Sequence, residues 1–417
     1  IISLRTLLSV DFENKSQGGY DMALKYEDVF RPGSFPEYTY ISRKSAVSDL
    51  SYEFRLEQAI KVSGFLTSLV GPSKMGKTIL CEKVIGLEKI VEVSGADFDE
   101  NTDFWKLAAS KVGLAYEGQF SSEKIIPDTR DKYEKKEVYA LTKDKIIEYY
   151  KQEKLVMVID DFHYAPPEKR MQIAQQLKDA IRRGFKAIVV SLPHRADEAI
   201  RQNADLSGRL SLINMEAWEV KDLKEIAKIG FAKLDIEIED DIAEKIAIES
   251  LTSPQLMQYI CLNICTILEL SQSGEKRVCS DILETAYRYT TANFEYGDVV
   301  AFLKKGPNPR GKSRKHFKAK DGRSYDLYEL IVKSIAENPP IMQLEFEDVQ
   351  ERIVKLLDDD SEKPKAQAIR EHLTKLQELI NGREDIFRVL DWKEGTLYIL
   401  DPLFLFYLRW GGTKSAQ

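Results

Sequence analysis

The sequence has few of the residues that form crosslinks or hold metal ions. It contains four cysteines and four histidines among 417 residues. The cysteines show no metal-ligand spacing, and two of them, Cys261 and Cys265, lie one helical turn apart, as core residues do. We therefore expect no metal or redox role for them. Because cysteines are few and no export signal is present, a reducing cytoplasm is the expected location.

Long apolar runs are also lacking. No run reaches the length of a membrane span, so we expect no membrane partner. Hydrophobic residues make up 43% and charged residues 31% of the chain, which is typical of soluble globular proteins, and the length suits two or three domains. The chain begins at Ile1 and not at methionine, which is compatible with a processed form or with part of a longer protein that carries an effector upstream.

One stretch combines glycines, a lysine and a hydroxyl at fixed spacing. Residues 71–78 read G-P-S-K-M-G-K-T between two apolar runs, which predicts a strand, a phosphate-binding loop and a helix. Gly71 and Gly76 let backbone N–H groups point at one anion, and the positive end of the helix faces the same anion. Lys77 is expected to reach the β- and γ-phosphates, and Thr78 to ligate Mg²⁺. We expect these residues to contact the nucleotide: Gly71, Pro72, Ser73, Lys74, Met75, Gly76, Lys77, Thr78 and Ile79.

A second signal is a buried strand that ends in two acids. Residues 155–159 are consecutively apolar, which predicts a strand buried on both faces, and Asp160 and Asp161 follow. Ligands of open α/β sheets bind at the carboxyl ends of the strands. Asp160 is therefore expected to hold Mg²⁺ together with Thr78.

A third strand is expected at 186–190, with Ser191 at its exit. Three arginines follow, Arg195, Arg201 and Arg209, and the last precedes a short strand at 212–214. An arginine here can reach a nucleotide bound to a neighbouring subunit and stabilise transition-state charge. We favour Arg209 for this role.

Helices are expected around these strands. Segments 102–113 and 137–152 have helical patterns and flank a polar surface excursion at 114–135. From Trp218 to Asn293 apolar residues recur at helical spacing, which predicts a small bundle. Within it, Ser253 and Pro254 suit a helix start, or else Pro254 approaches the nucleotide.

The C-terminal part predicts a winged helix. Helices are expected at 325–335, 346–357 and 366–380, a hairpin at 387–400, and an apolar helix at 403–410. The third helix carries a mixed set of charges: Lys365, Arg370, Glu371, His372, Lys375 and Glu378. That is a weak DNA-reading face, and such domains also contact proteins or restrain an adjacent ATPase module.

A basic segment lies between these parts. Residues 304–323 contain nine basic residues and one acid, whereas the chain as a whole has a net charge of −7. Its glycines and prolines predict a linker and not a helix. Such a segment binds polyanions such as DNA in a salt-sensitive manner, or it docks on the acidic surface of its own chain.

Taken together, the motifs resemble the AAA+/STAND group of P-loop ATPases, in its origin-recognition-like and STAND branch. The resemblance rests on residues 65–78, on Asp160-Asp161, and on Ser253-Pro254 where other members carry a lid arginine. It implies an α/β fold: a P-loop NTPase parallel sheet with a helical lid, then an α+β winged helix. The implied division is 1–37 N-terminal extension, 38–215 ATPase core, 216–296 lid, 297–324 basic linker and 325–417 winged helix.

The resemblance also implies roles for single residues. Tyr40 and Ile41 would form an apolar face for adenine and Arg43 a polar edge, with surface loop and core packing as the alternative. Asp161 stands where hydrolytic members carry a glutamate, which implies slow hydrolysis. Ser191 would sense the γ-phosphate from a strand inserted between those that carry residues 66–70 and 156–160.

These features together predict a MgATP-dependent switch with ATP/ADP and Mg²⁺ as ligands and with slow ATPase activity. Homo-oligomerisation is expected because the chain itself offers no clear arginine finger. The alternatives are a DNA-binding initiator- or transposition-type regulator, the sensor of a defence system with its effector elsewhere, and a nucleotide-locked scaffold.

Overall fold

The computed structural model describes residues 24–114, 117–125, 132–192, 208–270, 276–308, 313–382 and 388–411. Within it, five parallel strands form a sheet in the order β2-β5-β6-β1-β7. Their bounds are Ile90–Ser94, Val156–Asp160, Lys186–Ser191, Leu66–Val70 and Leu210–Asn214. The expected insertion of β6 between β1 and β5 is confirmed. The α/β class with a parallel P-loop sheet is confirmed as well.

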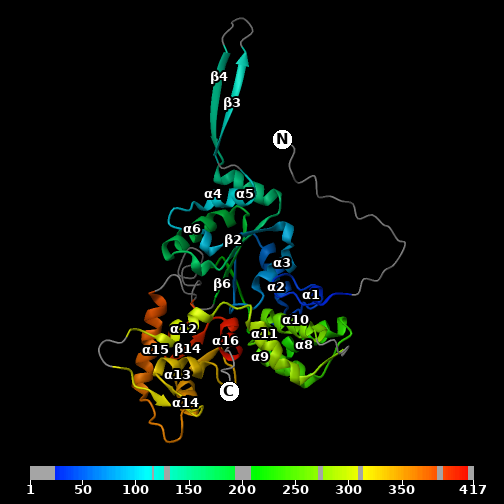
Figure 1. Cartoon of the computed structure of the whole chain (residues 1–417). Coiled ribbons are helices and arrows are strands. Elements are labelled where there is room, and N and C mark those ends of the chain that lie inside the picture. Colours follow the sequence, from blue (N-terminus) through cyan, green and yellow to red (C-terminus); the bar gives the residue numbers. More distant parts are fainter. Residues whose placement is uncertain are drawn as a thin grey trace.

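Helices cover both faces of this sheet (Figure 1) because its central strands are apolar on both sides. Alternate residues such as Met157 and Val189 pack against one helical layer, and Val158 and Ile188 against the other. The first layer is α4 (Phe104–Lys111), α5 (Lys143–Gln152) and α6 (Pro167–Arg182). The second is α2 (Tyr52–Lys61) and α3 (Lys77–Ile85).

The expected excursion near residues 114–135 contains a β-hairpin. Strands β3 (Glu117–Ile125) and β4 (Lys132–Ala140) pair antiparallel over nine residues, and the hairpin projects from the end of the molecule beyond α4 and α5 (Figure 1). The helix expected from 137 therefore begins only at Lys143. Thr142 accounts for this boundary, since its hydroxyl caps the helix by accepting from the backbone N–H of Lys145.

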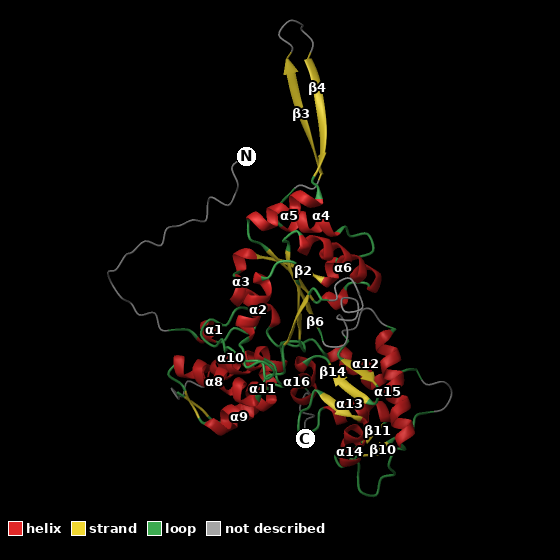
Figure 2. Cartoon of the chain, turned by 180° about the vertical axis from the view of Figure 1, so that it is seen from behind, coloured by secondary structure: helices red, strands yellow, loops and turns green. Residues whose placement is uncertain are grey.

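Helices follow the sheet, at the end of the molecule opposite the hairpin (Figure 2). They are α8 (Val220–Lys233), α9 (Asp240–Glu249), α10 (Pro254–Leu270) and α11 (Leu283–Thr291), with β8 (Glu237–Ile238) and β9 (Arg277–Val278) pairing beside them. The N-terminal helix α1 (Tyr26–Val29) contributes Val29 and Phe30 to the same hydrophobic core. Short 3-10 turns lie at Leu87–Lys89, Gly95–Asp97, Phe162–Tyr164 and Ser280–Ile282.

The C-terminal part contains three helices and a three-stranded sheet. The helices are α13 (Leu327–Ile335), α14 (Phe346–Leu356) and α15 (Ala366–Asn381), and the sheet order is β12-β14-β13, from Gln343–Glu345, Thr396–Ile399 and Leu390–Lys393. Helix α16 (Pro402–Trp410) closes the chain. The turn between β13 and β14 lies at Glu394-Gly395, whose positive φ angles of 55° and 86° suit a two-residue turn.

The basic segment is more structured than a linker. It begins inside α12 (Gly297–Lys305) and includes the paired strands β10 (Phe317–Lys318) and β11 (Ser324–Tyr325). Phe317 and Ala319 are buried, which anchors the segment to the C-terminal part. The sequence pattern missed this because two apolar residues among so many cations gave no periodic signal.

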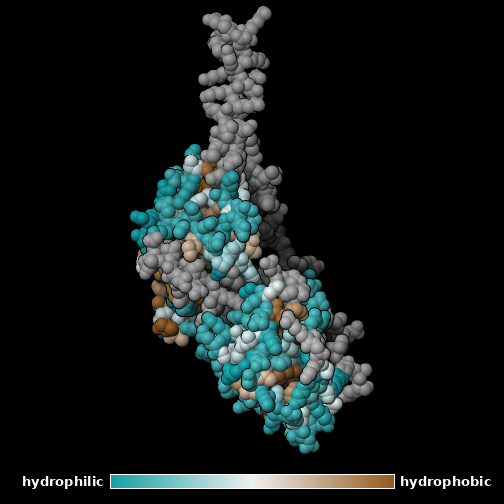
Figure 3. Space-filling view, turned by 90° about the vertical axis from the view of Figure 1, so that its left-hand side faces the viewer, coloured by the Kyte–Doolittle hydropathy of each residue, from teal (hydrophilic) through white to brown (hydrophobic). Residues whose placement is uncertain are grey.

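One hydrophobic core joins the helices that follow the sheet to the C-terminal part. Cys261 and Cys265 lie in this core as expected, and burial raises the pKa of both thiols. The face drawn in Figure 3 is mainly hydrophilic, with its apolar residues in small patches. In the described residues, no helix combines the length and the apolar character needed to span a bilayer.

Candidate nucleotide site

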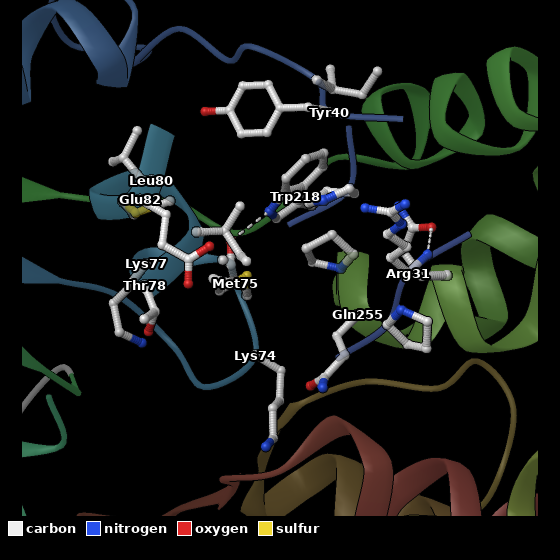
Figure 4. Close-up of a pocket in the computed structure, with 18 of the residues that line it drawn as sticks. Arg31, Tyr40, Lys74, Met75, Lys77, Thr78, Leu80, Glu82, Trp218 and Gln255 are labelled. Carbon is white, nitrogen blue, oxygen red and sulfur yellow. Dashed lines mark hydrogen bonds between the residues drawn. The ribbon is translucent and has the colours of Figure 1, made fainter. Parts of the chain in front are cut away.

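A cavity of about 360 Å³ opens at the carboxyl end of β1, between the loop of residues 71–76 and the start of α10. Figure 4 draws many of its lining residues. Four stretches of the chain meet here: residues 31–43, the loop with the start of α3, Asp160-Asp161 at the end of β5, and residues 254–258. The cavity thus brings together most of the residues that the sequence analysis selected.

The loop has the geometry that its glycines imply. Gly76 lies in the left-handed region with a φ of 85°, and Lys74 shares that region at 60°. A side chain at Gly71 would meet the backbone oxygen and the Cβ of Met215 at 3.0 Å, so only glycine fits without a shift. Helix α3 begins at Lys77 directly after the loop, as expected. Its free N–H groups and positive end therefore face the cavity.

Lys77 is the buried cation of the site. Its side chain is 8% exposed, and its amino group donates to the carbonyl oxygens of Gly71 at 3.0 Å and Pro72 at 2.7 Å. Burial lowers the pKa of Lys77 to about 8, although the nearby carboxylates of Asp160 and Asp161 oppose the shift. The charge of Lys77 is thus held by neutral dipoles and stays available to an anion.

Thr78 and Asp160 meet at the end of β5. The Thr78 hydroxyl donates to Asp160 Oδ2 at 2.6 Å. The oxygen atoms of Thr78 and Asp160 lie close together next to a phosphate-binding loop. They are suitable ligands for a hard cation such as Mg²⁺, which completes its coordination shell with phosphate oxygens and water. Within the described residues no group of three or more histidine, cysteine or acidic side chains could hold a metal by itself. The pair therefore suits a metal that arrives with a nucleotide.

Asp161 lines the cavity in a left-handed backbone conformation with a φ of 48°. Its backbone N–H donates to Asp160 Oδ1 at 2.8 Å, which fixes the turn. Desolvation, and then the charge of Asp160, raise the pKa of Asp161. A carboxylate with a raised pKa beside the metal pair is suited to accept a proton from water.

Tyr40 and Ile41 also line the cavity. The Tyr40 hydroxyl donates to Glu53 Oε1 at 2.5 Å, and burial raises its pKa, so the phenol stays protonated. The ring of Tyr40 stacks on Phe35, and the Lys83 amino group lies over it at 5.4 Å. This part of the lining therefore combines an aromatic ring with the apolar side chain of Ile41.

Arg43 lines the cavity but is largely engaged in tethering. Its Nη2 donates to the carbonyl oxygens of Glu216 and Ala217, both at 2.9 Å, and its guanidinium lies 4.5 Å from the Trp218 ring centre. Nη1 is buried and has no hydrogen-bond partner among the described residues. Burial lowers the pKa of Arg43. It therefore joins the N-terminal segment to the start of α8. Its Nε lies 3.5 Å from Asp222 Oδ2, and Nη1 is left over.

The helices after the sheet hold the loop through backbone contacts. Pro254 lines the cavity at the start of α10, and the neighbouring Ser253 hydroxyl donates to the Lys74 carbonyl at 3.3 Å. Trp218 Nε1 donates to the Met75 carbonyl at 3.0 Å, drawn as a dashed line in Figure 4. The Met75 side chain, 3% exposed, is buried. Trp218 thus contacts the loop, whereas its spacing alone had indicated only a core residue.

Sequence reasoning also missed a part of the wall that residues 31–36 form. Their prolines and glycine predicted only a connector. The backbone N–H of Arg31 donates to Gln258 Oε1, and Gln258 Nε2 donates to the Thr39 hydroxyl, so this segment is fixed to α10. The only hint in the sequence was the presence of aromatic residues at 35 and 40, whose rings stack in the structure.

Four expected residues lie outside the cavity wall: Gly71, Pro72, Ser191 and Arg209. The first two contact the wall through their carbonyl oxygens, which accept from Lys77. Ser191 ends β6 beside the loop, since the backbone N–H of Gly71 donates to its carbonyl at 3.2 Å. Its own hydroxyl is buried and has no hydrogen-bond partner among the described residues. Arg209 lies just before β7, at the amino ends of the strands and thus away from the loop. Its carbonyl there accepts from the Leu66 backbone N–H. Arg195 and Arg201 lie outside the described residues.

The basic segment makes many of its contacts with the acids of its own chain. Lys315 lies 2.5 Å from Glu362, Lys318 2.9 Å from Asp358 and Lys320 3.7 Å from Asp359. Arg314, which is less exposed, pairs with Asp326 at 2.6 Å. Of the two alternatives for this segment, these contacts favour docking on the chain's own acidic surface. Arg310 and Lys312 lie outside the described residues.

The third helix of the C-terminal part, α15, uses several of its polar residues for packing. The Arg370 guanidinium lies over the Phe346 ring at 3.5 Å, and the half-buried His372 packs against Tyr328. Burial lowers the pKa of His372. Lys365 and Lys375 remain exposed. The face expected to read DNA is therefore poorer in free donors than the sequence indicated.

Comparison with known proteins gives only distant structural similarity. No family model matches the chain, and no curated protein matches it in sequence. Among solved structures, Cdc6p from Pyrobaculum aerophilum shares 15% identity over 92% of this chain and 97% of its own, with a TM-score of 0.39. A Walker-type ATPase of Pyrococcus abyssi shares 13% identity over 89% of this chain and 99% of its own, with a TM-score of 0.46. The ORC2 protein of Aeropyrum pernix, solved as ADPNP-ADP complexes, shares 14% identity over 89% of this chain and 94% of its own, with a TM-score of 0.45. Similarity at this level does not bear on activity, and the function has to be inferred from the site itself.

Proposed function

We propose that the chain is a MgATP-binding and ATP-hydrolysing molecular switch of the AAA+/STAND type. The observation that carries this proposal is a cavity whose lining has two unlike parts. One part contains the buried cation of Lys77, the start of α3 and the Thr78–Asp160 pair. The other part contains Tyr40 and Ile41. A nucleoside triphosphate has the same polarity, with a charged phosphate chain and a flat base.

In this proposal the chain's residues divide the chemistry of ATP between them. The loop from Gly71 to Gly76 and the first turn of α3 bind the phosphates through N–H groups, and Lys77 leaves its carbonyl partners to contact the outer phosphates. Thr78 and Asp160 hold Mg²⁺, which neutralises charge on the phosphate oxygens. Asp161 accepts a proton from the attacking water, and Ser191 turns its unpartnered hydroxyl toward the γ-phosphate. We expect slow turnover because an aspartate is one methylene shorter than the usual glutamate.

A short segment, residues 249–253, supports the switch. At its end, the Ser253 hydroxyl donates to the phosphate-loop carbonyl of Lys74. At its beginning, Glu249 accepts two hydrogen bonds from the Arg409 guanidinium, at 2.6 Å and 3.0 Å, and one from Trp410 Nε1. A change in the loop on nucleotide binding therefore has a direct path of contacts to α16.

The same segment is held in a costly backbone conformation. Leu251 and Thr252 both lie in the left-handed region, at φ angles of 53° and 63°. This is uncommon for any residue other than glycine, and more so for the β-branched Thr252. Two such residues in succession persist only when contacts on both sides fix them. We infer that nucleotide exchange at the loop changes this segment and with it the position of the C-terminal part.

We further propose that residues 325–417 form a winged helix, because α13, β12, α14, α15 and the β13–β14 hairpin follow one another in the order that such a domain requires. We keep the division into an ATPase core, a helical lid and this domain that the sequence predicted. The lid and the winged helix share one hydrophobic core, which the sequence did not predict. That shared core favours a role for the winged helix as a restraint on the ATPase module, over an independent DNA reader.

Assembly into a homo-oligomer is proposed from the arginines around the cavity. Of those that line it, Arg31 pairs with Asp28 at 3.3 Å and Arg43 is engaged with backbone carbonyls. Neither is free to approach the phosphates. Arg209, about 20 Å from the loop along β1 at 3.3 Å per residue, serves a neighbouring subunit in this proposal.

The DNA-binding alternative keeps one supporting observation, the exposed Lys375 on α15 and the exposed Lys365 just before it. The paired lysines of the basic segment speak against it, and we rank it second. The defence-sensor and scaffold alternatives find no specific support among the contacts described.

The test is equilibrium binding of ATP in the presence of Mg²⁺, together with phosphate release. Lys77→Ala should weaken ATP binding by about a hundredfold or more, because a buried charged hydrogen-bond donor is lost. The control is Lys61→Ala, an exposed lysine on α2 that pairs with Glu57. Unchanged ATP affinity in Lys77→Ala would disprove the nucleotide assignment. Binding without phosphate release would leave a nucleotide-locked scaffold.

A further inference from the structure

Four carboxylates line the cavity, and three of them have defined polar contacts. Glu53 accepts from the hydroxyls of Tyr40 and Ser42. Asp160 accepts a hydrogen bond from the Thr78 hydroxyl, and the adjacent Asp161 also has an interaction partner. The carboxylate of Glu82, the fourth, makes no hydrogen bond or ion pair in the part of the chain that the structure describes. The cavity thus contains one acceptor group without a protein donor.

Glu82 lies on α3, one helical turn beyond Thr78 and three residues beyond Ile79. Figure 4 shows its carboxylate directed toward the cavity. Its neighbour Lys83 is not its partner, because the Lys83 amino group lies over the rings of Phe35 and Tyr40 at 5.7 Å and 5.4 Å. Partial burial, and then the charge of Glu92, raise the pKa of Glu82. An acid in this setting is stabilised by any donor that a ligand supplies.

The position of Glu82 along α3 indicates which part of a nucleotide supplies that donor. In the proposed binding mode the phosphates lie at the start of the helix, at Lys77 to Ile79. One helical turn, about 5.4 Å, separates this point from Glu82. The group that follows the innermost phosphate of a nucleotide is the ribose. The base lies farther away, against Tyr40 and Ile41.

We propose that Glu82 accepts hydrogen bonds from the ribose hydroxyls of the bound nucleotide, so that the site selects ribonucleotides over deoxyribonucleotides. This inference rests on the proposed nucleotide site. A carboxylate near a triphosphate is unfavourable unless it gains a hydrogen-bond donor, and the ribose hydroxyls are the donors within one helical turn of the phosphates. Binding a diol through an acidic side chain is an established solution in other nucleotide folds.

The experiment compares the affinities of four ligands for the full chain with Mg²⁺ by calorimetry. They are ATP, 2′-deoxy-ATP, 3′-deoxy-ATP and the triphosphate of purine riboside, which lacks the amino group of adenine. The wild-type protein should bind ATP about tenfold more tightly than at least one deoxy analogue, since a hydrogen bond to a charged group is lost. It should bind the purine riboside analogue about as tightly as ATP.

Substitution of Glu82 then identifies the acceptor. Glu82→Ala should bind ATP about tenfold more weakly and should no longer distinguish ATP from the deoxy analogues, whereas Glu82→Gln should keep part of the preference through its amide oxygen. Glu88→Gln, an exposed glutamate just beyond α3, is the matched control and should behave as wild type. Thermal unfolding of all three variants checks that the fold is kept.

The outcomes separate this inference from the function beneath it. If the wild-type protein binds no nucleotide, the proposed function fails. If it binds ATP and both deoxy analogues equally, only the ribose assignment fails. A loss of affinity confined to the purine riboside analogue, and abolished in Glu82→Ala, would overturn the ribose assignment in favour of the adenine amino group.

Discussion

Two groups of cations stand out in the sequence, and they differ in what surrounds their charge. Lys77 is buried and donates to two neutral carbonyl oxygens, those of Gly71 and Pro72. Lys318, from the basic segment, is largely exposed and lies beside the carboxylate of Asp358. A buried cation held by neutral dipoles keeps its full charge available to a ligand anion. The charge of an ion-paired cation is already balanced by a carboxylate of the same chain. Partners therefore matter more for anion binding than the local count of charges.

Arg209 is a third kind of cation and gives the largest expected effect. It is partly exposed and makes no side-chain hydrogen bond or ion pair with the residues that the structure describes. If it serves a neighbouring subunit, Arg209→Ala should lower ATP turnover about a thousandfold and leave ATP affinity unchanged, because a transition-state contact is lost. Phosphate release and calorimetry measure the two quantities.

A mixing experiment tests whether the contact is between subunits. Asp160→Asn retains Arg209 but loses its metal ligand, so mixed oligomers of the two variants contain some intact sites. Phosphate release should then rise above that of either variant alone. If mixing restores nothing, Arg209 is not a trans finger. Arg55→Ala is a suitable control, since Arg55 donates to the carbonyl of Leu212 in β7, the strand that follows Arg209.

The basic segment gives the next largest effect. The triple variant Asp358→Asn, Asp359→Asn, Glu362→Gln removes the partners of three lysines. DNA affinity at low salt should rise about tenfold or more, and the plot of log K against log [salt] should steepen by about 0.9 for each freed lysine that contacts a phosphate. Fluorescence anisotropy with a labelled duplex measures both.

A charge-matched control separates pairing from net charge. Glu57→Gln, Asp241→Asn and Glu284→Gln also remove three acids, each from an ion pair on an exposed helix. This control should leave the salt slope unchanged. If both triple variants bind DNA equally, the pairing of the basic segment has no bearing on DNA, and net charge alone accounts for the gain.

The same contrast explains what could be predicted from the sequence. The sheet and the phosphate loop were predictable because local order fixes them: apolar runs of strand length followed by glycines or acids. The Thr78–Asp160 pair, 82 positions apart, was predictable because the carboxyl ends of parallel strands meet at one edge of a sheet. The hold of Trp218 on Met75 and of Gln258 on the N-terminal segment was not, since each joins residues more than a hundred positions apart. The partners of Lys318 and Lys320 could not be predicted either, because each lysine pairs with an acid some forty positions away in the sequence.

The smallest expected effect concerns the stability of the nucleotide- and metal-free protein. Lys77→Met replaces a buried charge by an apolar side chain of similar length, and the free energy of unfolding at pH 7 should rise by about 1–3 kcal/mol. Chemical denaturation measures it. Lys318→Met is the matched control: because Lys318 is exposed, its substitution should change stability far less. Lower stability of Lys77→Met would mean that the carbonyl contacts of Lys77 stabilise the fold.

The pH dependence of this difference gives a sharper test of the buried charge. The folded pKa of Lys77 is lowered to about 8, whereas the unfolded value is about 10.4. Between these values the unfolded chain binds a proton that the folded protein has lost, so wild-type stability rises with pH relative to Lys77→Met. The advantage of the variant should therefore shrink from pH 8 upward and vanish near 10.4. A difference that stays constant over this interval would show that Lys77 titrates alike in both states, and the contrast between the two groups of cations would no longer hold.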